Sequence, residues 1–369
     1  MRIASVEVSE ITMTRREAFV SSRARVDERR ILLVSIRDTD GYEGWGECSA
    51  PEEPRYCEEW TNASWEVMNT ILVPSLLRKA NLTAKEVREH FDAYRGNKMA
   101  KAAIEAACWD IEARRRNMPL WQFLGGTDDP VPCGVALGIM DSVDELIVRI
   151  EREIDSGYRR IKLKIKPGWD IRIVEAVRAK FARLDLMLDA NGAYGIDDLD
   201  TLKALDKFEL LMIEQPFAPD DLWAYQEARQ QLSTPICLDE TVVSVLSAKA
   251  ALLFRLCEII NVKLGRVGGH AEARDIVKLC LDHGIPCWCG GQHEAGIGRA
   301  HSIALATLMR RDIPSELSAS ARYWTEDIII PEINVDEQGY LHPPTGPGIG
   351  FEVNRRLIDA ATKRRLVHR

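Results

Sequence analysis

The chain has 369 residues, 46% hydrophobic and 29% charged, which is enough for a full hydrophobic core. Its formal net charge of −8 is spread along the sequence, which excludes a basic surface for nucleic acid or an anionic membrane. The N-terminus lacks an apolar signal segment, no apolar run reaches membrane-spanning length, and the nine cysteines show no paired framework, so we expect a cytoplasmic protein with reduced thiols.

Residues 1–125 are expected to form an α+β unit. Three segments with alternating apolar residues predict an antiparallel sheet: 4–12, 30–37 and 43–48. The polar stretch Arg15–Arg29 has no clear periodicity, and we expect a long mobile loop there. Three segments with apolar residues at spacings of three and four predict helices: 58–77, 84–94 and 98–116.

Strands and helices are expected to alternate strictly through residues 126–318. The eight expected strands are 131–139, 161–165, 186–190, 211–215, 236–240, 259–264, 285–290 and 313–317. Helical patterns lie between them, and this alternation predicts a parallel sheet. Eight strands in about 190 residues favour a closed (β/α) barrel over an open doubly wound sheet.

Five charged residues end consecutive expected strands: Lys164, Asp189, Glu214, Asp239 and Lys263. Their separations, by subtraction of residue numbers, are 25, 25, 25 and 24, which suits one strand, one helix and two short loops. A charge at the end of a buried strand is costly unless it is paired, bound to a metal or facing a wet cavity. Because barrel enzymes carry their sites at the carboxyl ends of the strands, the pattern predicts an active site.

The three carboxylates follow consecutive strands, so we expect them to converge at one side of the barrel mouth. Hard oxygen ligands that leave positions open for water and substrate suit Mg²⁺ better than zinc, and Mn²⁺ or Co²⁺ are expected to substitute. The alternative is that each carboxylate pairs with a neighbouring Lys or Arg. Three carboxylates in register weaken that alternative, because charged side chains are rarely buried.

Lys164 and Lys263 end the second and sixth expected strands, which face each other across an eight-stranded barrel. A lysine serves as a base only when its pKa falls well below roughly 10.4, and Lys162 and a bound metal would both lower the pKa of Lys164. Two amines on opposite faces of one carbon, beside a cation, predict removal of the proton α to a carboxylate through an enediolate. The alternatives are structural or surface lysines, or a Schiff-base lysine of the aldolase type.

The motifs around these residues resemble the enolase superfamily. They are Lys162-Leu163-Lys164, Asp189-Ala190-Asn191, Glu214-Gln215-Pro216, Asp239-Glu240 and Lys263-Leu264-Gly265-Arg266. Within the superfamily the chain resembles the muconate-lactonizing subgroup, most closely the o-succinylbenzoate synthase and N-acylamino-acid (N-succinylamino-acid) racemase family. The resemblance implies a TIM-type (β/α)₇β barrel over 126–318. An α+β capping domain would form from 1–125 and be completed by the C-terminal segment 319–369.

The resemblance also implies roles for individual residues. Lys164 would be the base, Lys263 the opposed acid or base, and Lys162 the partner of the substrate carboxylate. The implied Mg²⁺ ligands are Asp189, Glu214 and Asp239. The implied substrate-binding residues are Phe19, Ala136, Asn191, Arg266, Gly291, Gln292, His293, Glu294 and Tyr323. Arg266 is typical of members that racemise as well as dehydrate.

The expected activity is Mg²⁺-dependent racemisation of N-succinyl or other N-acyl amino acids, dehydration to o-succinylbenzoate for menaquinone synthesis, or both. We expect a small-molecule carboxylate substrate and a homo-oligomer. Cycloisomerisation or dipeptide epimerisation is the alternative activity, and a barrel that has lost catalysis is disfavoured because all five charges are present.

Three residues depart from the family pattern and predict a shifted substrate specificity. Gln292 and His293 stand where apolar residues usually line the substrate, and Ala136 stands where the family often has serine. His293 is interpreted as a substrate contact or an additional acid, the alternative being a structurally bonded imidazole.

Overall fold

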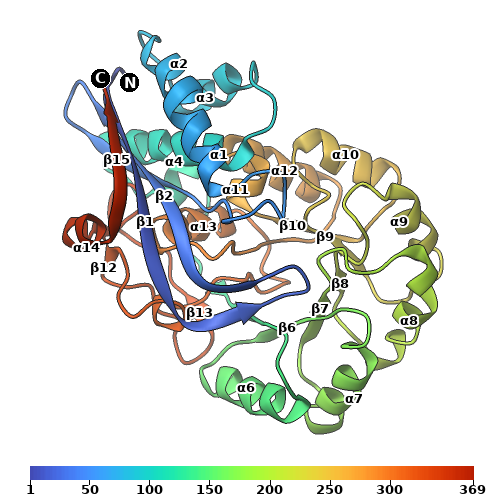
Figure 1. The fold of residues 1–369 in the computed structure, drawn as a ribbon. Coiled ribbons are helices and arrows are strands. Elements are labelled where there is room, and N and C mark those ends of the chain that lie inside the picture. Colours follow the sequence, from blue (N-terminus) through green and yellow to red (C-terminus); the bar gives the residue numbers. More distant parts are fainter.

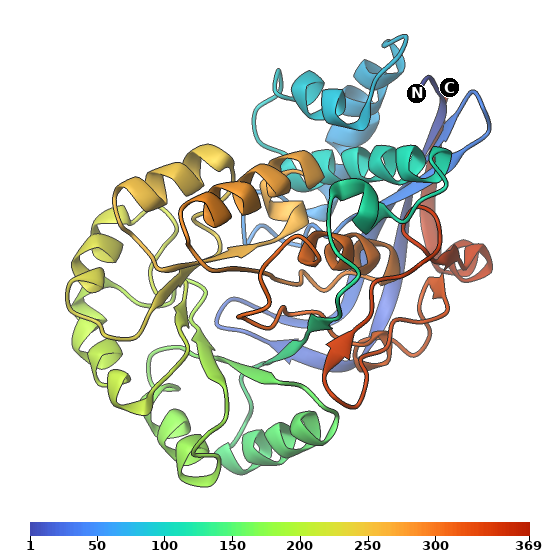
Figure 2. The same ribbon diagram turned by 180° about the vertical axis from the view of Figure 1, so that it is seen from behind.

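The computed structural model describes residues 1–369, and its larger part is a curled parallel sheet with helices outside it (Figures 1 and 2). The sheet has seven strands in the order β11-β10-β9-β8-β7-β6-β5. They are β5 (Gly134–Leu137), β6 (Arg160–Lys164), β7 (Leu186–Asp189), β8 (Ile213–Glu214), β9 (Ile236–Leu238), β10 (Ile259–Val262) and β11 (Cys287–Cys289). The predicted alternating barrel is therefore confirmed.

The helices between these strands cover the outer face of the sheet. They are α6 (Val143–Asp155), α7 (Ile171–Lys180), α8 (Leu199–Lys203), α9 (Leu222–Arg229), α10 (Val245–Leu253), α11 (Leu264–Val267), α12 (His270–Asp282) and α13 (Gly296–Ala306). Helix α6 illustrates why they form. Ser142 accepts a hydrogen bond from the backbone N–H of Glu145 and so caps the helix, while Leu146 and Ile150 bury one face.

The eighth expected strand, 313–317, is not a regular strand in the structure. Its backbone nevertheless joins the two edges of the sheet. The N–H of Gly134 donates to the carbonyl of Ser315 at 2.7 Å, and the N–H of Glu316 donates to the carbonyl of Cys289 at 2.8 Å. Pro314 has no backbone N–H, which prevents a continuous ladder here. The segment still closes the barrel and brings Glu316 to its interior.

A separate antiparallel sheet has the order β15-β1-β2-β3. Its strands are β1 (Ile3–Val20), β2 (Arg25–Asp38), β3 (Glu43–Cys48) and β15 (Thr362–His368), and the two chain termini lie side by side (Figure 1). The expectation of a mobile loop at Arg15–Arg29 is wrong, because β1 and β2 pair out to Val20 opposite Arg25. Arg15 and Arg29 are buried, so the inner face of this hairpin is polar and its alternation is hidden.

The helices of the N-terminal part lie between this sheet and the barrel helices. They are α1 (Thr61–Val67), α2 (Val73–Leu77), α3 (Ala84–Phe91), α4 (Lys98–Arg115) and α5 (Leu120–Leu124), with a π-helical turn at Met68–Leu72 between α1 and α2. The predicted helices are therefore confirmed. Helix α4 lies directly on β3, where a Cβ on Gly46 would come within 1.9 Å of the carbonyl oxygen of Ala103. Only glycine allows this approach.

The C-terminal part adds short elements before β15. They are β12 (Ile329–Ile330), which pairs with β14 (Glu352–Val353), β13 (Tyr340–Leu341), which pairs with β4 (Val131–Pro132), and α14 (Arg355–Ala361). None of the helices combines the length and apolar character that a membrane span requires.

Candidate active site

The charged residues predicted at the strand ends lie together at one end of the parallel sheet. Lys162 and Lys164 lie on β6, Asp189 ends β7, Glu214 ends β8, and Asp239 and Lys263 directly follow β9 and β10. In register, Lys164 is opposite Asp189, and Asp189 is opposite Glu214. The three carboxylate side chains are fully buried and the amines nearly so. The structure therefore brings the predicted residues together.

Two residues with left-handed backbone shape these strand ends. Asn191 has φ 47° and Gln215 has φ 42°. The N–H of Asn191 donates to Asp189 Oδ1 at 2.9 Å. Gln215 Oε1 accepts from the N–H of Asp239 at 3.0 Å, which ties the end of β8 to the end of β9. Gln215 was not predicted as a site residue, and these bonds make it a positioning residue for the carboxylate of Asp239.

Lys164 and Lys263 each bond a carboxylate and line the same cavity. Lys164 Nζ donates to Asp189 Oδ2 and to Asn191 Oδ1, each at 2.6 Å. Lys263 Nζ donates to Asp239 Oδ2 at 2.6 Å. Because β7, β8 and β9 lie between β6 and β10 in the sheet, the two amines approach the cavity from different sides.

Lys162 lies deeper and is enclosed by acids. Its Nζ is 3.1 Å from both Asp189 Oδ2 and Glu214 Oε2, and it also pairs with Glu316. Burial lowers the pKa of Lys162, but Glu214, Glu316 and Asp189 outweigh it, so the pKa is raised. Conversely, burial raises the pKa of Asp189, while Lys164 and Lys162 bring it below its ordinary value. The floor of the cavity is therefore a charged network rather than a set of neutral groups.

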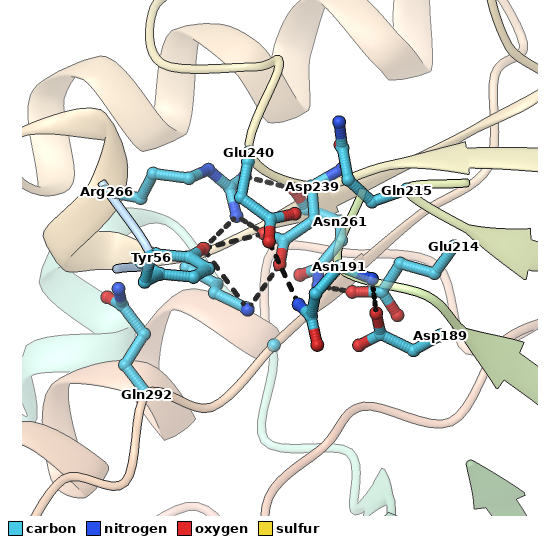
Figure 3. A network of polar contacts seen from close by, with 12 residues as sticks. Tyr56, Asp189, Asn191, Glu214, Gln215, Asp239, Glu240, Asn261, Arg266 and Gln292 are labelled. Carbon is cyan, nitrogen blue, oxygen red and sulfur yellow. Dashed lines mark hydrogen bonds and ion pairs between the residues drawn. The ribbon is translucent and has the colours of Figure 1, made fainter. Parts of the chain in front are cut away.

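A second network surrounds Asp239 (Figure 3). The Tyr56 hydroxyl donates to Asp239 Oδ1 at 3.0 Å and accepts from Lys263 Nζ at 3.3 Å. Burial raises the pKa of Tyr56 to about 12, which keeps the phenol protonated. Arg266 also donates to Asp239, and its Nε donates to the carbonyl of Val242 at 2.9 Å. Tyr56 lies in a loop without a recognisable motif, so the sequence offered no signal for it.

The cavity above the lysines has a volume of about 450 Å³. The predicted residues that line it are Phe19, Lys162, Lys164, Asn191, Lys263, Gly291, Gln292 and His293. The other predicted substrate-binding residues, which are Ala136, Arg266, Glu294 and Tyr323, are buried outside this lining. Cavity-lining residues that were not predicted include Arg29, Ser49, Tyr56 and Glu316.

The residues at the strand ends fit a divalent cation in their chemistry but do not form a ready-made cation site. As they stand, no three acidic, His or Cys side chains are gathered closely enough to hold a metal, because the carboxylates bond lysines and Arg266. Their chemistry fits Mg²⁺ nonetheless. Asp189, Glu214 and Asp239 offer hard oxygens on three adjacent strands, away from solvent, and already interact with positive charge.

Comparison with known proteins covers both parts of the chain. Residues 3–125 match the mandelate racemase / muconate lactonizing enzyme N-terminal domain, and residues 145–357 match the enolase C-terminal domain-like family. An o-succinylbenzoate synthase of Geobacillus kaustophilus is 45% identical over 100% of this chain and 98% of its own length. An N-succinylamino acid racemase of Amycolatopsis sp. is 40% identical over 98% of both.

The solved structures agree with these relatives. The crystal structure of an enolase-superfamily member from Listeria innocua has a TM-score of 0.95 and 36% identity, and the match covers 100% of this chain and 99% of that one. The resemblance predicted from the sequence is therefore confirmed along the full length, and so is the predicted fold class.

Proposed function

The chain belongs to the mandelate racemase / muconate lactonizing enzyme family of the enolase superfamily, and we propose that it removes the proton α to the carboxylate of N-acyl amino acids. It is a lyase or isomerase of that superfamily. Racemisation of N-succinyl or other N-acyl amino acids is the proposed reaction, with dehydration to o-succinylbenzoate as a second reaction of the same site. Cytoplasmic location and homo-oligomeric assembly remain predictions.

The observation that carries this proposal is the placement of two amines around one cavity. Lys164 and Lys263 come from strands separated by three others, and both line the cavity. An α-carbon held between them has one amine on each face. Lys164 as a neutral amine takes the α-proton, and Lys263 as an ammonium delivers a proton to the opposite face, which inverts the configuration. Dehydration needs only Lys164. The proton that Lys164 takes from the α-carbon is passed to the β-hydroxyl group, which leaves as water.

The neighbouring residues support this chemistry. Asn191 and Tyr56 bond Lys164 and Lys263 respectively, and so fix where each amine points. Asp189, Glu214 and Asp239 would hold Mg²⁺, with Mn²⁺ or Co²⁺ as substitutes. A divalent cation bound there would offset the negative charge that the substrate carboxylate gains as the proton leaves. The ammonium group of Lys162 lies beside Glu214, and its positive charge adds to that stabilisation.

The test is exchange of the α-proton for deuterium in D₂O with Mg²⁺, followed by mass spectrometry on separate enantiomers of N-succinyl and N-acetyl amino acids. We expect exchange and racemisation, both lost when a chelator removes divalent cations and both restored by Mg²⁺. Formation of o-succinylbenzoate from its precursor is followed by absorbance.

Single lysine variants make the test specific. Lys164→Ala and Lys263→Ala should each lower racemisation by at least about a hundredfold, and each should spare exchange of a different enantiomer. Lys180→Ala is the matched control, because Lys180 lies on the outer helix α7 in an exposed ion pair with Glu151. Full racemisation by either site variant would contradict the two-base proposal.

A further inference from the structure

Arg15 is a buried cation without an acidic partner. It lies on β1, its residue is 8% exposed, and it forms no ion pair in the structure. Its Nε donates to the carbonyl of Glu17 at 3.1 Å, and its Nη1 lies 3.0 Å from His293 Nδ1. A buried guanidinium that lacks a carboxylate is costly. Such a group calls for an anionic partner that the chain itself does not supply.

His293 links Arg15 to the cavity, because it bonds Arg15 and also lines the cavity wall. A guanidinium can only donate, so Nδ1 of His293 accepts its hydrogen bond and the ring hydrogen must sit on Nε2. The structure gives Nε2 no hydrogen-bond partner, and His293 lines the same cavity as Lys164 and Lys263. Its backbone has φ 59°, an uncommon conformation for a residue other than glycine, which is typical of functional sites.

Two aromatic rings hold the imidazole in place. The Phe19 ring contacts it edge to face with centroids 4.7 Å apart, and the Tyr323 ring does so at 6.0 Å. The Arg15 guanidinium lies 4.9 Å from the centroid of the Tyr323 ring. Burial, followed by the charges of Arg15, Arg29, Lys164 and Arg299, lowers the pKa of His293 well below its ordinary value. The ring is therefore a fixed neutral N–H donor in a positive environment.

We propose that Arg15 and His293 form a subsite for a carboxylate on the side chain of the substrate amino acid. This inference rests on the proposed function and names its substrate class, N-acyl derivatives of acidic amino acids. His293 Nε2 would donate to the side-chain carboxylate, and the charge of Arg15 would balance it. An aliphatic side chain would leave the charge of Arg15 without an anion and the Nε2 hydrogen of His293 without an acceptor, which disfavours it.

The enclosure of this subsite favours the side chain over the acyl group as its occupant. Phe19 and His293 line the cavity, and the buried residues Arg15 and Tyr323 lie behind the imidazole, so this wall of the cavity is closed to solvent. The cavity also reaches the exposed residues Arg25 and Arg55, where a longer acyl group has access to solvent. The two substituents of the α-carbon would therefore occupy different regions of the cavity.

The test separates these two substituents. N-acetyl and N-succinyl derivatives of glutamate, glutamine and norleucine are compared by kcat/KM for α-proton exchange with Mg²⁺. We expect glutamate to exceed norleucine by about tenfold to a hundredfold with either acyl group, the effect of one hydrogen bond to a charged group. Glutamine should fall between them, because its amide accepts a hydrogen bond but carries no charge.

Variants locate the preference in the two residues. Arg15→Leu and His293→Leu should each remove the preference for glutamate, mainly by raising KM, and His293→Gln should restore part of it because its amide can donate. Arg16→Leu is the matched control, since Arg16 is the next residue on β1 but is exposed and donates to the carbonyl of Trp324. Circular dichroism confirms that each variant is folded.

Three results would overturn the subsite: equal or better kcat/KM for norleucine in the unmodified enzyme, an unchanged preference in both leucine variants, or variants that alter only the ratio of succinyl to acetyl substrates. Absence of exchange with every compound would instead defeat the proposed function. In that case calorimetry of N-succinyl-glutamate against N-succinyl-norleucine decides the subsite, and equal affinities would overturn it.

Discussion

Tyr56 is the residue through which the N-terminal part of the chain reaches the reacting groups. Its hydroxyl bonds both Asp239 and Lys263. Tyr56→Phe keeps the ring and removes this link, so the two side chains lose a shared partner. We expect kcat to fall by about tenfold, the value of one hydrogen bond to a charged group, with little change in KM. Steady-state kinetics with Tyr42→Phe, an exposed tyrosine of the same part, is the comparison, and an unchanged kcat would contradict the role.

For individual site residues, the sequence predicted those that recur at the same place in each strand-helix unit. It missed those that lie outside this repeat. Lys164, Asp189, Glu214, Asp239 and Lys263 occupy the same place in successive strand-helix units, so their spacing alone placed them at one end of the sheet. Tyr56, by contrast, reaches the site from a loop of the other part of the chain. Its place depends on how the two parts pack together, which local sequence patterns do not contain.

The β1–β2 hairpin is the element that covers the site (Figure 1). At its tip, Ser22 Oγ donates to the carbonyl of Ala190 at 3.0 Å, and Arg23 Nε donates to the carbonyl of Asn191 at 2.8 Å. Both acceptors follow β7, directly beside the residues that end that strand. The tip of the hairpin is therefore fastened to the rim of the site, while Glu17 of β1 pairs with Arg149 and Arg152 of α6.

Loosening this fastening should affect binding more than stability. Arg23→Ala removes the bonds to the loop after β7, so the hairpin opens more often and KM should rise by about threefold to tenfold, the value of one or two modest hydrogen bonds. Proteolysis at the tip should become faster while Tm changes little. Arg25→Ala is the control for proteolysis, because Arg25 pairs only with Asp27 of the same hairpin. Equal cleavage of both variants would contradict this role of Arg23.

The same hairpin shows why one element was mispredicted. A strand is predicted from alternation between apolar and polar residues, but here the buried positions include Arg15 and Arg29, and Arg29 lines the cavity. A polar inner face removes the alternation although the backbone still forms an antiparallel hairpin, whose register shifts between Thr14 and Phe19. The outer helices were predicted well for the opposite reason, since their buried faces are apolar and their outer faces meet water.

Across the whole molecule, acidic side chains of the N-terminal part cap helices of the barrel. Glu47 of β3 accepts from the N–H groups of Ala295 and Gly298 at the start of α13, at 2.8 and 2.7 Å. Glu105 of α4 accepts from the N–H groups of His270 and Ala271 at the start of α12, at 2.7 and 2.9 Å. Helix N-termini favour such acceptors. These contacts couple the antiparallel sheet and α4 to the barrel, so the two parts should unfold together.

The Glu47 contact makes the stability of the assembled molecule depend on pH. Burial, opposed by the N–H group of Gly298, raises the pKa of Glu47 from 4.5 to about 8. The folded state therefore holds a proton that the unfolded state releases between these values. Since the folded state binds more protons there, this contribution to stability is complete below about pH 4.5 and is lost as the pH rises through about 8.

Glu47→Gln should flatten this pH dependence. Glutamine stays neutral at every pH, so the fall in Tm between about pH 5 and about pH 9 should shrink by a few degrees. At the lower pH the variant should be slightly less stable, because the amide NH₂ group of glutamine faces one of the two N–H groups, where the hydroxyl oxygen of the protonated carboxyl can still accept. Glu43→Gln on the same strand is the control.

Arg355 and Ser35, acting against burial, lower the pKa of Glu43. The carboxylate of Glu43 is therefore ionised in both the folded and the unfolded state over this pH range, and its removal leaves the slope of Tm against pH unchanged. Thermal unfolding followed by circular dichroism at both pH values measures the difference, and an unaltered slope in Glu47→Gln would show that this carboxyl is ionised in the folded enzyme.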